Sequence, residues 1–128
     1  MSELTPYLAV ADARAAIAWY GDALGAVVTY EPIEMPDGRI GHVELEVDGA
    51  RWMMSDAHPE LMCPAPTPGV GSPVTLHLTV DDVDAVAARC QAAGADLDRG
   101  PEDSPPAGRV AVLRDPFGHR WFLNRPSG

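Results

Sequence analysis

Three side chains that can take up or release protons alternate with apolar residues along one segment of the chain. His42, Glu44 and Glu46 are spaced two residues apart, so in an extended strand they share one face. A carboxylate desolvated in a pocket can act as a general base. Glu44 or Glu46 is therefore the candidate base, and Tyr7 or His77 the candidate acid. Exposed carboxylates on strands are common and usually inert, so the sequence leaves open whether the protein is an enzyme.

The segments that carry these residues belong to two copies of one module. The run LAVAD at 8–12 returns as LTVDD at 78–82, and GARW at 49–52 returns as GHRW at 118–121. The first pair is shifted by 70 residues and the second by 69. A Gly-Ala pair between these blocks recurs in the same order. Such ordered similarity indicates an internal duplication.

The duplication predicts one domain of 128 residues built from two tandem modules, 3–56 and 73–126. Five prolines and two glycines fall within 59–73. Because proline removes a backbone donor and glycine weakens regular structure, 57–72 is predicted to be a linker. A second proline-rich loop is expected at 100–108.

Each module is predicted to fold as one strand, one helix and three further strands. Asp12 and Asp82 stand where an N-cap belongs, and apolar residues then follow at helical spacing. Gly25 and Gly94 stand where each helix should end. The later strands are expected near 26–33, 39–47 and 50–56 in the first module. In the second they are expected near 95–99, 109–114 and 119–125.

This doubled βαβββ pattern resembles the vicinal-oxygen-chelate superfamily, which includes glyoxalases, bleomycin-resistance proteins and dioxygenases. The segment DPFGHRW at 115–121 is similar to the superfamily's final hairpin, and WMMSD at 52–56 is most similar to its PhnB-like branch. The resemblance implies an α+β fold in which two tandem βαβββ modules form a curved mixed sheet or half barrel with the helices outside. It does not imply one reaction, because members range from metalloenzymes to metal-free drug-binding proteins.

The resemblance also implies where a metal would be held. The four metal-ligand positions of the superfamily correspond to Thr5, Met53, Thr75 and Phe122. None of these residues is a good ligand for a divalent cation. We therefore expect neither a metal nor another cofactor. The alternative is a metal-dependent lyase, isomerase or dioxygenase whose ligands are displaced to His42, Glu44 and His77, which could form a facial triad.

Strand alternation divides the residues of each predicted strand between the core and an open face. Pro6, Leu8 and Val10 are expected to face the helices, as are Trp52, Met54, Trp121 and Leu123. On the opposite, open face, Ala9, Ser55 and Asn124 are expected. The open face then carries polar and aromatic residues of both modules, and a ligand is expected there. The predicted ligand-binding residues are Tyr7, His42, Glu44, Met53, His77, Arg120 and Phe122.

Net charge and composition indicate which kinds of partner to expect. The formal net charge is −10, which repels nucleic acid and anionic lipid, so neither is expected as a partner. A small-molecule ligand, aromatic or cationic, fits the aromatic, methionine-rich and acidic face. No signal peptide or membrane-spanning run is recognisable, and a cytoplasmic location is expected.

Three functions remain open: a metal-free protein that sequesters a drug or metabolite, the displaced-metal enzyme, and a dimer whose cavity is vestigial. We favour the first. Open strand edges and an exposed apolar rim also predict a homodimer, to which Trp19, Met53, Met62 and the proline-rich linker are expected to contribute.

Overall fold

The computed structural model describes all 128 residues and divides them into two compact units. Unit 1 comprises Met1–Pro66 and unit 2 comprises Thr67–Gly128. The division falls inside the segment 57–72 that the sequence predicts to be a linker. Part of that segment has structure of its own, since Pro59–Leu61 forms the 3₁₀ helix η1 and His58 bridges to Cys63.

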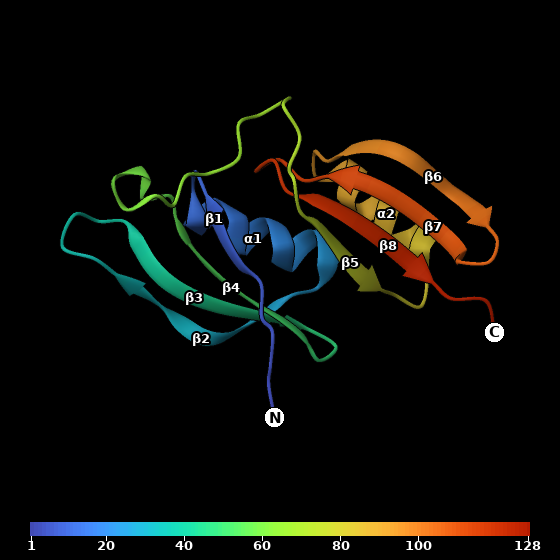
Figure 1. Cartoon of the computed structure of the whole chain (residues 1–128), viewed down its shortest axis with the longest axis horizontal. Helices are drawn as coiled ribbons and strands as arrows, with labels where there is room; N and C mark the ends of the chain where they lie inside the picture. The colour runs from blue at the N-terminus through green and yellow to red at the C-terminus, as the bar shows by residue number, and fades with distance from the viewer. The chain divides into compact units, whose positions relative to one another are not determined.

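Unit 1 is a four-stranded mixed sheet with one helix (Figure 1). Its elements are β1 (Tyr7–Val10), α1 (Ala13–Leu24), β2 (Val27–Glu34), β3 (Ile40–Val47) and β4 (Ala50–Asp56). The strand order is β1-β4-β3-β2, with β1 parallel to β4 and the other neighbours antiparallel. This arrangement leaves β2 as one edge of the sheet.

Unit 2 repeats the same topology. Its elements are β5 (Thr75–Thr79), α2 (Val83–Ala92), β6 (Asp96–Ser104), β7 (Gly108–Arg114) and β8 (Arg120–Arg125). The order β5-β8-β7-β6 matches that of unit 1, again with one parallel pair. The predicted α+β fold of two βαβββ modules is confirmed, and it takes the form of two separate, open sheets.

The helices begin where the sequence predicts. The side chains of Asp12 and Asp82 accept hydrogen bonds from the N–H groups of Ala15 and Ala85, each at 3.0 Å. Gly25 ends α1 with φ of 73°, a left-handed conformation that glycine adopts without steric cost. Neither helix is long and apolar enough to cross a membrane.

Each helix packs on one face of the sheet of its own unit, which leaves the other face open. The core lies between helix and sheet and contains the predicted inward residues of the last strands. Trp52 and Trp121 are each 3% exposed, and Met54 and Leu123 are fully buried. Strand alternation therefore separates core from open face correctly at these positions.

Near the strand ends, strand alternation predicts the buried and exposed residues incorrectly. Pro6 is exposed and precedes β1, although it was expected to face the helix. Ala9, Ser55 and Asn124, expected on the open face, are buried. The Asn124 amide donates to the carbonyl oxygens of Ala107 and Arg109, so a neighbouring loop covers it. Trp19 is also buried, so the prediction that it contributes to an exposed apolar rim is wrong.

The second proline-rich loop was also predicted wrongly. Most of 100–108 is strand, because β6 continues to Ser104 and β7 starts at Gly108. Pro101 fits because β6 is the edge strand and needs no outward donor. At Gly100 a Cβ atom would collide with the carbonyl oxygen of Val110, so only glycine allows β6 to approach β7 this closely.

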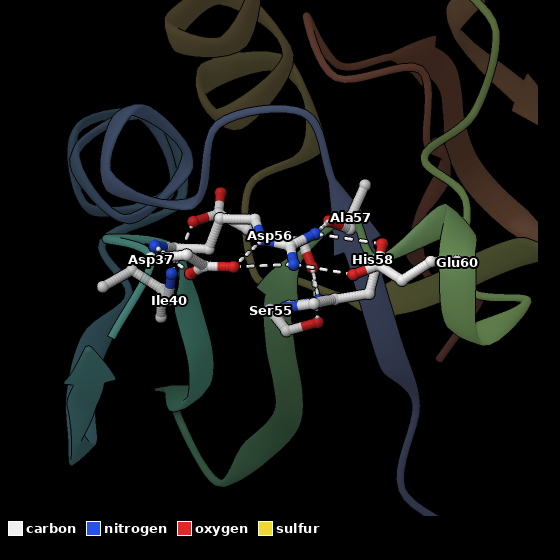
Figure 2. A network of polar contacts seen from close by, with 8 residues as sticks. Asp37, Ile40, Ser55, Asp56, Ala57, His58 and Glu60 are labelled. Atoms are coloured by element: carbon white, nitrogen blue, oxygen red, sulfur yellow. Dashed lines mark hydrogen bonds and ion pairs between the residues drawn. The ribbon is translucent and has the colours of Figure 1, made fainter. Parts of the chain in front are cut away.

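Asp56 is buried at the end of β4 and connects α1, β3 and the segment after β4 in unit 1; Figure 2 shows its contacts with Ile40 and His58. Asp56 accepts from the N–H of Ala13 at 2.7 Å and from the N–H of Ile40 at 2.6 Å. Its carbonyl oxygen accepts from Nδ1 of His58 at 2.7 Å. Nearby, Arg39 donates to both carboxylate oxygens of Glu60, and this contact lowers the pKa of Glu60 to about 2. These contacts fix the segment that follows β4 against the hairpin of β2 and β3.

Candidate functional site

The open face of unit 1 carries a row of side chains that crosses all four strands. Tyr7 of β1 is paired with Met53 of β4, which is paired with Glu44 of β3, which is paired with Tyr30 of β2. Residues paired in this way have neighbouring side chains on one face. The register therefore brings together three of the predicted ligand-binding residues and adds Tyr30.

A chain of hydrogen bonds connects Tyr7, His42 and Glu44 within this face. The Tyr7 hydroxyl lies 2.7 Å from Nδ1 of His42, and Nε2 of His42 lies 2.9 Å from Oε2 of Glu44. Because an ionised carboxylate only accepts, Nε2 must carry a proton. In neutral His42 the Nδ1 atom is then an acceptor, and Tyr7 donates to it.

The same geometry also accommodates a protonated His42. The Nδ1–H group would then donate to the Tyr7 oxygen, and the Tyr7 hydroxyl could donate to the carbonyl oxygen of Gly41 at 3.2 Å. The pKa of Tyr7 is raised, first by burial and then by the nearby Cys63 and Glu44, so Tyr7 stays protonated at neutral pH. In both arrangements the Nε2–H group of His42 donates to the Glu44 carboxylate.

Aromatic rings surround His42. Its ring centroid lies 5.4 Å from that of Tyr7 and 5.4 Å from that of Tyr30. Tyr7 and Tyr30 are 50% and 51% exposed, so both rings present surface to solvent. The position of Tyr30 beside His42 was not predicted from the sequence. Three register shifts between β2 and β3 break the strict alternation of β2, so counting residues does not predict its contacts.

Unit 2 gathers the other three predicted residues on its own open face. His77 and Phe122 are register partners, and their rings stack with a centroid distance of 5.4 Å and an interplanar angle of 17°. Two residues earlier in both strands, Nη1 of Arg120 donates to Oγ1 of Thr75 at 2.6 Å. The predicted residues thus form two clusters, one in each unit.

Clefts in unit 2 lie elsewhere. One of about 350 Å³ lies beside the start of α2, and another of about 310 Å³ lies against the C-terminal residues. Neither is lined by a predicted ligand-binding residue. Arg109 borders both and is already held by the carboxylate of Asp84 through two hydrogen bonds, at 2.9 and 2.8 Å. The open faces therefore remain the better candidates, because they expose aromatic surface together with polar groups.

Comparison with known proteins identifies the family. Residues 4–123 match the model of the Glyoxalase/Bleomycin resistance protein/Dioxygenase superfamily. The chain belongs to this superfamily. Within it, a Mycobacterium tuberculosis protein without an assigned function is 42% identical over 127 residues, which cover 96% of this chain and 74% of the relative.

Several solved structures share the fold of this chain. TioX from Micromonospora sp. ML1 is 26% identical, with a TM-score of 0.75 over 99% of this chain and 100% of that one. A bleomycin-binding protein complexed with bleomycin is 21% identical, with a TM-score of 0.69 over 99% of this chain and 100% of that one. A PhnB protein from Bacillus cereus, 16% identical with a TM-score of 0.72 over 97% and 99% of the two chains, is another structural neighbour. Identities of 21% and 16% show the fold alone.

The residues that the resemblance assigns to metal-ligand positions do not fit a divalent cation. Phe122 offers no donor atom, and Met53 offers only a thioether. The Thr75 hydroxyl already accepts from the Arg120 guanidinium, whose charge would repel a cation. No group of three His, Cys, Asp or Glu side chains is arranged to hold a metal. At the displaced ligands of unit 1, both ring nitrogens of His42 are hydrogen-bonded, so coordination would have to break a contact to Tyr7 or Glu44.

Proposed function

We propose that this superfamily member is a metal-free small-molecule-binding protein and that it holds an aromatic or cationic ligand. The observation that carries the proposal is the cluster of Tyr7, Tyr30 and His42 against the carboxylate of Glu44. Half-exposed rings beside a fixed carboxylate suit a planar or cationic ligand through stacking, cation–π contact and charge attraction. The bleomycin-binding protein of the same fold supports small-molecule binding.

The predicted ligand-binding residues Met53, His77, Arg120 and Phe122 belong to the same proposal. Met53 supplies a polarisable apolar contact in the row that joins Tyr7 to Glu44. His77 and Phe122 supply a stacked pair of rings in unit 2. Glu44 would set the orientation of a ligand in unit 1 rather than act as a free base, because it is engaged by His42.

A titration with benzyltrimethylammonium, followed by NMR of the full chain, tests this function. The probe should perturb resonances of Tyr7, Tyr30 and His42, whereas neutral benzyl alcohol should bind more weakly. Tyr30→Leu keeps an apolar side chain but removes the ring, and should weaken binding roughly two- to fivefold.

Glu44→Gln removes the charge with little change in shape and should weaken binding by a similar factor. Glu46→Gln is the matched control, because Glu46 lies two residues along β3 and forms no hydrogen bond or ion pair with His42. Equal losses of affinity in the two variants would show that binding depends on the overall negative charge rather than on a site. A probe that leaves the open face of unit 1 unperturbed would refute the proposed function.

We also propose a cytoplasmic homodimer. The edge strand β2 exposes Val27, Tyr30 and Ile33, and Met62, at the end of η1, is 91% exposed. An unpaired strand edge with apolar side chains is a ready surface for a second chain. Light scattering at micromolar concentration tests this, and a mass equal to the 13.6 kDa of one chain would refute it.

A further inference from the structure

Two arginines at equivalent positions of the two modules have different partners. Arg51 of β4 and Arg120 of β8 are separated by the repeat shift of 69 residues. Arg51 forms an ion pair with Glu3. The residue equivalent to Glu3 in the second module is Pro73, which has no charge. Arg120 instead donates to the neutral hydroxyl of Thr75 and takes part in no ion pair.

The acidic side chains that pair with Arg114, Asp96 and Asp98, form no ion pair with Arg120. Asp98 lies close enough for Arg120 to contribute to lowering the pKa of that carboxyl, but the larger cause is Arg114. Arg114 holds Asp98 with two hydrogen bonds, at 2.8 and 2.9 Å, and lies 3.8 Å from Asp96. Because Arg114 is the register partner of Arg120, two like charges face each other across the strands. Both carboxylates form their ion pairs with Arg114 and none with Arg120, so an anion beside Arg120 would relieve the repulsion.

An aromatic platform lies beside this guanidinium. The stacked His77 and Phe122 occupy the next same-face position along β5 and β8. Two residues along a strand span about 7 Å. A ring placed against His77 and Phe122 could therefore direct an attached anionic group to Arg120, whose planar fork of N–H donors matches carboxylate and phosphate oxygens.

We propose that the open face of unit 2 binds an aromatic compound that carries an oxyanion, with the ring against His77 and Phe122 and the oxyanion on Arg120. This inference rests on the proposed small-molecule binding and adds the charge of the group that unit 2 accepts. Unit 2 then prefers an anionic ligand, whereas Glu44 of unit 1 favours a cationic one. Carboxylate and phosphate share the required chemistry.

Benzoate and phenyl phosphate are the probes, each titrated into the full chain and followed through the ring resonances of His77 and Phe122. Both rings should shift on addition of at least one probe, and a stronger response to one will distinguish carboxylate from phosphate. Acetate, which lacks the ring, and benzylamine, which reverses the charge, should shift them far less. Arg120→Gln should weaken binding about tenfold, because it removes a charge-assisted hydrogen bond.

Arg51→Gln is the matched control and should leave benzoate binding unchanged, because Arg51 is neutralised by Glu3. The proposal is overturned if neither anionic probe shifts His77 and Phe122, if benzylamine binds there equally well, or if Arg120→Gln binds as tightly as the wild type. Such a result would leave the proposed small-molecule function supported if benzyltrimethylammonium still bound to unit 1. The proposed function itself would be refuted if that probe did not bind.

Discussion

Adjacent substitutions in β8 test whether the open face has been assigned to the correct side of the sheet. Trp121 is 3% exposed, and its Nε1 donates to Oδ2 of Asp115 at 2.9 Å. Trp121→Ala should lower the free energy of unfolding by roughly 3–5 kcal/mol, the usual cost of truncating a buried aromatic side chain. That loss approaches the whole stability of a small domain, so unit 2 could unfold outright.

Phe122 should respond differently because it is only half-buried and lies against His77 on the open face. Phe122→Ala removes a stacking contact and part of a burial, so it should cost about 1 kcal/mol. Urea denaturation followed by near-ultraviolet circular dichroism gives both values. Trp52→Ala and Met53→Ala, the equivalent substitutions in unit 1, repeat the comparison.

If the two losses of stability came in the opposite order, the assignment of the buried and open faces of the strands would be wrong. If Phe122→Ala unfolded unit 2 while Trp121→Ala left its stability intact, every residue assigned to the open face of β8 would be displaced by one position. Similar losses from both substitutions would show that both faces of β8 are covered, and the open face of unit 2 would not exist.

Three further predictions concern stability, reactivity and metal content. Asp56→Asn should lower the free energy of unfolding by about 2–3 kcal/mol, measured by thermal or urea unfolding, because an amide has one acceptor oxygen for the two N–H groups that the carboxylate binds. Asp12→Asn should leave the free energy of unfolding nearly unchanged, because asparagine also caps helices. Equal effects would contradict the role of the buried carboxylate. Burial raises the pKa of the Cys90 thiol to about 11, so a thiol reagent at pH 8 should label Cys63 well before Cys90, as peptide mapping would show. Elemental analysis of protein freed of any affinity tag should find no stoichiometric transition metal; about one per chain, lost in His42→Ala, would show that the displaced-metal alternative is correct.

Local features of the fold could be predicted from the sequence because the forces behind them act over a few residues. Asp12 and Asp82 cap their helices through N–H groups three positions away. Trp52 and Trp121 face the core because side chains alternate along a strand. The duplication predicted the second module's topology from the first, and its similarity to a known superfamily is confirmed by the match over 4–123.

Contacts between strands were decided by the tertiary structure. The register of β1, β3 and β4 brings Tyr7, His42 and Glu44 within hydrogen-bonding distance, and the irregular pairing of β2 adds Tyr30. Counting residues predicts which face a side chain occupies, but the partner depends on register and bulges, which are set by the packing of the whole sheet.

The same limit explains the errors and the differences between the two units. The strand at 100–104 was expected to be a loop because its proline is tolerated only at a sheet edge, and the sequence does not show which strand lies there. Arg51 and Arg120 occupy equivalent positions, yet the first is paired with Glu3, 48 residues earlier in the chain, and the second is paired with Thr75. Which side chain neutralises a charge depends on segments that only folding brings together, so the charge of each open face follows from the tertiary structure.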